Sequence, residues 1–69
     1  MPDRTEQFEK MLADVKANYR DTVAKMEKLK AEGREKSATY RQLMGNRLTY
    51  RNMLSLYRVY GLLEEGDNL

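Results

Sequence analysis

The N-terminal half of the chain carries large apolar or β-branched side chains at strictly alternating intervals of four and three residues. These positions are Phe8, Leu12, Val15, Tyr19, Thr22, Met26 and Leu29. Heptad spacing of this kind lines up the side chains along one edge of an α-helix, where they can pack on a second helix. Asp3 and Glu6 precede this seam with the spacing of a capping box, which satisfies free backbone N–H groups at a helix start. We therefore predict a first helix over about residues 3–32.

The segment that follows the seam contains no large apolar side chain. Gly33 can adopt the left-handed backbone conformation that ends a helix, and Ser37 can cap the next helix. We predict a turn over about residues 33–37 and a second helix over about residues 37–60. Gly61 stands where a glycine commonly ends a helix.

One alternative to a turn is a single long helix, because the heptad register continues through this segment with Gly33 and Lys36 in seam positions. Such a helix would have about 55 residues and a length of roughly 80 Å. Two successive seam positions without apolar groups would leave a hole in a continuous coiled coil. We therefore predict an all-α fold in which residues 1–69 form one domain, a two-helix antiparallel hairpin.

The segment Tyr50–Leu63 is the most apolar part of the chain, with nine large apolar or aromatic side chains among fourteen residues. One neighbouring helix cannot cover so wide an apolar surface. A chain of 69 residues also has a marginal core of its own, and this one lacks the cysteine and histidine needed for disulfides or zinc sites. We therefore predict self-association into a helical bundle, with a homodimer that forms a four-helix bundle favoured. The predicted oligomer interface is Met53, Leu56, Tyr57, Tyr60 and Leu63.

The apolar stripe of the second helix changes face near Gly45. Either Gly45 and Asn46 kink the helix, or a straight helix meets the first helix with one face and a second subunit with another. We favour the straight helix because it also explains the wide apolar surface near the C-terminal end. The residues expected to pack on the first helix are Tyr40, Leu43, Met44, Leu48 and Leu54.

The charges are nearly balanced, with 13 basic and 11 acidic residues, and an acidic tail occupies residues 62–69. This balance is unlike that of a basic nucleic-acid-binding tail. Arg47, Arg51 and Arg58 of the second helix nevertheless share a sector of about 40°, and interleaved Tyr and Arg can stack bases and hold phosphates. The same residues can instead cover the rim of a protein interface. The candidate nucleic-acid contacts are Arg41, Arg47, Arg51 and Arg58.

The sequence lacks the groups that most catalytic sites need, because it has no His or Cys and no Gly-rich phosphate loop. We therefore predict that the protein is not an enzyme and holds no cofactor or metal. No apolar run approaches the about 20 residues that span a bilayer, which predicts a cytoplasmic protein without membrane contact. The predicted function is a structural or regulatory role through protein–protein contact, with the same chain or a different protein as partner. A nucleic-acid-binding bundle is the alternative.

Overall fold

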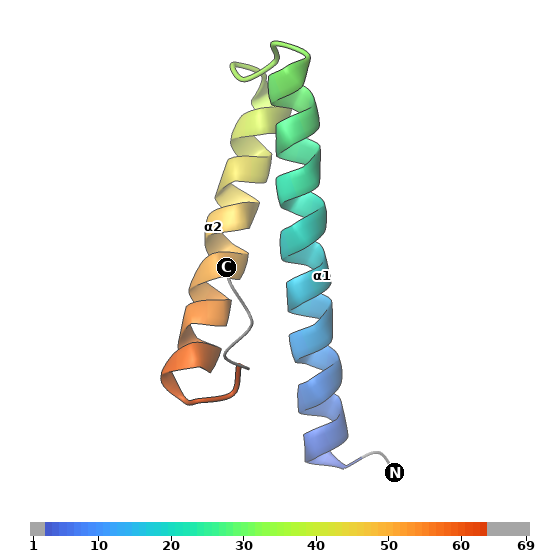
Figure 1. Ribbon diagram of the computed structural model, residues 1–69, viewed down its shortest axis with the longest axis vertical. Helices are drawn as coiled ribbons and strands as arrows, with labels where there is room; N and C mark the ends of the chain where they lie inside the picture. The colour runs from blue at the N-terminus through green and yellow to red at the C-terminus, as the bar shows by residue number, and fades with distance from the viewer. Residues whose placement is uncertain (1–2, 64–69) are drawn as a thin grey trace.

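Two α-helices lie side by side and antiparallel in the computed structural model, which describes residues 3–63 (Figure 1). Helix α1 spans Arg4–Ala31 and helix α2 spans Ala38–Val59, and a short turn joins them at one end of the molecule. The predicted all-α hairpin is therefore confirmed, and the alternative of one long helix is excluded. Each observed helix end lies within one residue of the predicted bounds, 3–32 and 37–60.

Side-chain caps begin both helices. The Asp3 carboxylate accepts a hydrogen bond of 2.8 Å from the backbone N–H of Glu6. The Ser37 hydroxyl oxygen accepts one of 3.1 Å from the N–H of Tyr40, and the same hydroxyl donates to the Arg34 carbonyl at 2.8 Å. Ser37 thus closes the turn and starts α2, because its single oxygen serves both as donor and as acceptor.

Glycines in the left-handed conformation end both helices, with φ of 74° at Gly33 and 71° at Gly61. After α1, the N–H of Arg34 donates to the Leu29 carbonyl at 2.8 Å, and the N–H of Gly33 donates to the Lys30 carbonyl at 3.0 Å. This pair of bonds is the Schellman motif, and the same pair recurs around Gly61. The turn predicted at Gly33 is therefore confirmed.

The core lies along the predicted seam of α1. Leu12, Val15, Thr22 and Met26 are buried, and the other three seam residues are half-buried. From α2, Leu54 is fully enclosed and packs with Leu12 and Val15. Burying a side chain of this size contributes about 1.5–3 kcal/mol to the stability of the hairpin. The residues packed around this cluster are Phe8, Tyr19, Tyr50, Met53, Tyr57 and Leu63.

Two of the α2 residues expected to pack on α1 remain exposed instead, Met44 by 44% and Leu48 by 58%. The reason is helical geometry: Met44 lies about 80° and Leu48 about 120° around the helix from the buried Leu54. Arg47 lies only about 20° from Leu54 and takes the seam position on that turn. Its side chain is accordingly half-buried, and it lines a small hollow with Met26 and other residues of α1.

Helix α2 continues without interruption through Gly45. The backbone there is not left-handed, and the Thr49 hydroxyl donates to the Gly45 carbonyl at 3.1 Å, one helical turn earlier. A methyl group added at Gly45 would meet nothing within 4 Å. The helix is therefore uninterrupted at Gly45, and glycine at this position is not required by the fold.

Within residues 3–63, neither helix has the long uncharged apolar stretch needed to cross a lipid bilayer. Most of the predicted acidic tail, residues 64–69, lies outside the described part of the chain.

Candidate functional site

The charges of the two helices differ in kind. Helix α1 mixes acidic and basic side chains along its exposed surface, and Asp21 and Lys25 form an ion pair at 2.9 Å. Helix α2 contains four arginines and no acidic residue between Ala38 and Val59. Every charged group that α2 offers to a partner is therefore a guanidinium, which binds carboxylates and phosphates through paired N–H donors.

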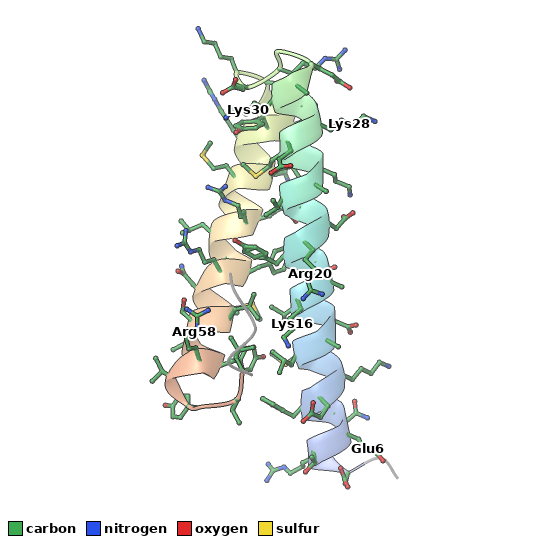
Figure 2. All side chains as sticks on the ribbon, in the orientation of Figure 1. Glu6, Lys16, Arg20, Lys28, Lys30 and Arg58 are labelled. Atoms are coloured by element: carbon green, nitrogen blue, oxygen red, sulfur yellow. The ribbon has the colours of Figure 1, made fainter. Side chains whose placement is uncertain are left out.

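An arginine-rimmed hollow is lined by residues of α2 alone and lies beside the face of this helix that packs on α1. Met44 and Leu48 are spaced by one helical turn and form an exposed apolar floor, with Gly45 between them. The hollow has a volume of about 490 Å³. Figure 2 shows side chains of α2 projecting away from α1 along the helix. The residues that line the arginine-rimmed hollow are Arg41, Met44, Gly45, Arg47, Leu48 and Arg51.

A second surface of α2, the C-terminal apolar patch, lies at the C-terminal end of the helix and in the turn that follows it. Its four side chains are large, apolar or aromatic, and between 46% and 78% exposed. The patch lies roughly 20 Å along the helix axis from the centre of the hollow, at 1.5 Å per residue. The residues of the C-terminal apolar patch are Leu56, Val59, Tyr60 and Leu62.

The structure separates the five residues of the predicted oligomer interface into two groups. Leu56 and Tyr60 belong to the C-terminal apolar patch and are 62% and 76% exposed. Met53, Tyr57 and Leu63 are partly buried against the core of their own hairpin. Helical geometry explains the division, because Leu56 lies about 160° around α2 from the buried Leu54, whereas Tyr57 lies about 60° from it.

The aromatic ring of Tyr57 has a specific partner within the chain. It meets the ring of Phe8 edge-on, with centroids 5.4 Å apart and planes at 79°. Edge-to-face pairs of this kind contribute about 0.5–1.5 kcal/mol beyond the area that they bury. Tyr57 therefore joins the two helices near the open end of the hairpin.

Two members of the patch, Val59 and Leu62, were not among the predicted interface residues. Val59 follows Leu56 by three residues and precedes Tyr60, so the helical spacing of exposed apolar positions could have identified it. Leu62 is placed by the Schellman turn at Gly61, and its exposure depends on how that turn folds back.

The four candidate nucleic-acid contacts are also divided by the structure. Arg41, Arg47 and Arg51 line the same hollow, whereas Arg58 does not. Figure 2 shows Arg58 near the C-terminal end of α2. Three arginines around one apolar floor can bind an anionic group that is flanked by apolar ones.

Among residues 3–63, no three acidic side chains come close enough together to hold a metal ion. Comparisons of the chain with protein-family models, with curated proteins and with solved structures find no match. The exposure, charge and position of the α2 side chains are therefore the observations that indicate a role.

Proposed function

We propose that this protein is a non-enzymatic cytoplasmic module that acts through protein–protein contact, and that its first partner is a second copy of itself. The observation that carries the proposal is the C-terminal apolar patch. Its members Val59 and Tyr60 are 78% and 76% exposed in the isolated hairpin. Contiguous apolar surface of this kind on a small soluble chain is typical of an interaction site.

The size of the core supports the same proposal. Two helices of this length bury only four apolar residues between them, one of them from α2. Small domains with so little buried surface are usually stabilised by disulfides, metals or association, and this chain has no cysteine or histidine. Association through α2 would give that helix a second packed face and complete a four-helix bundle.

A symmetric dimer fits the chemistry of the patch. In a two-fold contact the same surface meets itself, so a patch free of charged groups can pair without repulsion. The four patch side chains carry no charge, and burying each one contributes about 1–3 kcal/mol. The patch is therefore suited to contact with its own copy, as a structural or regulatory assembly requires.

The absence of native cysteine allows a direct test by cross-linking. Single-cysteine variants Leu56→Cys and Tyr60→Cys would be treated with a bifunctional thiol reagent at low protein concentration. Met11→Cys is the matched control, because Met11 is also apolar and 48% exposed but belongs to α1. We expect efficient covalent dimers from the two patch variants and few from the control. Equal yields from all three would contradict the proposed interface.

A nucleic-acid-binding bundle is the second candidate, and the absence of acidic residues from α2 favours it. Phosphate contacts release counterions, so the affinity for RNA or DNA would fall steeply with salt concentration. A salt titration with duplex RNA and duplex DNA tests this candidate. Loss of affinity in the variant Arg41→Gln with Arg51→Gln would support it, and no binding at low salt would exclude it.

A further inference from the structure

We infer that the arginine-rimmed hollow is a binding site for an acidic amphipathic helix of a different protein. This inference concerns the middle of α2, and it does not depend on the proposed self-association through the C-terminal apolar patch. The centres of the hollow and of the patch are separated by roughly 20 Å along the helix.

The floor of the hollow can accept apolar side chains from a partner. Met44 and Leu48 are exposed there, and methionine adapts its shape to irregular surfaces. Gly45 has no side chain, and a Cβ atom added to it would meet nothing within 4 Å. A helix that presents leucine-sized residues at intervals of three and four can place one such side chain in this opening.

The rim of the hollow specifies the charge of the partner. Arg41 and Arg51 stand about 15 Å apart along α2, on either side of the apolar floor. Among residues 3–63, no acidic side chain forms an ion pair with either of them. Carboxylates that flank an apolar stripe on the partner would meet these guanidinium groups at both ends of the floor.

The same charges argue against a symmetric contact between two copies at this site. A two-fold contact centred on the hollow would place Arg41 and Arg51 against the same arginines of the second copy. Because α2 has no acidic residue, nothing on that helix would offset the repulsion. The hollow therefore requires a partner with acidic groups, whereas the C-terminal apolar patch does not.

The hollow is also less suited to nucleic acid than to a peptide. Binding of single strands commonly relies on exposed aromatic rings that stack on bases. The hollow has no aromatic lining residue, and Tyr50 and Tyr57 are packed against the hairpin core. An apolar aliphatic floor between guanidinium groups matches leucine and glutamate better than it matches a base and a phosphate.

The experiment uses the full chain and a synthetic probe peptide of about 18 residues, long enough to form helix. The probe carries leucines at helical spacing, glutamates on both flanks of that stripe and a fluorescent label. Its affinity would be measured by fluorescence anisotropy for the unmodified chain and for two variants. The first variant combines Arg41→Glu with Arg51→Glu, and the second is Gly45→Leu, which fills the hollow. The charge-matched control combines Arg4→Glu with Arg20→Glu, both exposed on α1.

We expect the probe to bind the unmodified chain, and binding to weaken by about tenfold in each of the two hollow variants. The control and the mass of the protein in solution should change little, and circular dichroism confirms that every variant remains helical. A version of the probe with lysines in place of glutamates should not bind. The inference is overturned if the control loses as much affinity as the hollow variants, or if duplex RNA binds at the hollow while the probe does not. It is also overturned if the hollow variants dissociate the protein into monomers, since a second copy would then occupy the site.

Discussion

The two helices contribute to the hairpin in opposite ways. Helix α1 buries four residues along one seam, carries charges of both signs elsewhere and exposes Met11 as its one large apolar side chain in the described region. Helix α2 buries Leu54 alone, carries positive charge only and, with its following turn, exposes six large apolar side chains. The hairpin therefore covers most of the apolar side chains of α1 and leaves many of those of α2 exposed, which places the interaction surfaces on α2.

The largest effect is expected from removing the one α2 side chain that the hairpin fully encloses. Leu54→Ala should lower the free energy of unfolding by about 2–5 kcal/mol, because it leaves a cavity against Leu12 and Val15. The matched change Leu48→Ala removes the same atoms from a position that is 58% exposed, and it should cost far less. Urea denaturation followed by circular dichroism measures both. Equal losses of unfolding free energy in the two variants would contradict the difference in burial between Leu54 and Leu48.

The next effect concerns the turn that makes α1 and α2 antiparallel. Gly33→Ala forces a side chain into the left-handed conformation, at φ of 74°, and should destabilise the protein by about 1–2 kcal/mol. Gly33→Asn should recover part of this loss, because asparagine tolerates that conformation better. Thermal unfolding of the two variants gives the comparison. A gain in stability with alanine would mean that the chain does not turn at this glycine.

The start of α2 gives a smaller effect. Ser37→Ala removes the cap on the Tyr40 N–H and should cost about 1 kcal/mol. Ser55→Ala is the control within the same helix, because its hydroxyl donates to a carbonyl that already belongs to the helix, that of Arg51. The midpoint of urea denaturation should fall for the first variant and stay nearly constant for the second.

The smallest effect has the opposite sign. Gly45→Ala should stabilise the chain by about 0.5–1 kcal/mol, because alanine restricts the unfolded chain and its methyl group meets nothing within 4 Å. Thermal unfolding would show a raised midpoint. A lowered midpoint would mean that something covers Gly45 in solution, as a second copy seated on the hollow would do.

The sequence was most informative for α1, whose core-facing side chains form a single seam. The seam of α1 could be predicted in full, because every large apolar residue except Met11 and Val23 follows one heptad register. The helix ends could also be predicted, because Asp3, Gly33 and Ser37 act through local backbone chemistry. Neither the heptad register nor the capping residues depend on which other chain the protein contacts.

The packing of α2 was harder to predict because its apolar residues surround the helix. Periodicity does not show which of several apolar faces meets α1. In addition, the charged residue Arg47 occupies a position of α2 that faces α1, so the apolar spacing is interrupted there. Met44 and Leu48 were therefore assigned to the core although they form the floor of a hollow. Tyr57 is predicted for the oligomer interface, and within the hairpin its ring also pairs with that of Phe8. Only three-dimensional packing distinguishes these faces.

We propose that a second copy of the chain covers the C-terminal apolar patch of α2, and the mass of the unmodified protein in solution tests this proposal. Light scattering would be recorded across a dilution series, with helicity followed by circular dichroism at the same concentrations. We predict a dimer or larger assembly at high concentration, and a loss of helicity as it dissociates. A monomer that stays fully helical at every concentration would contradict the claim.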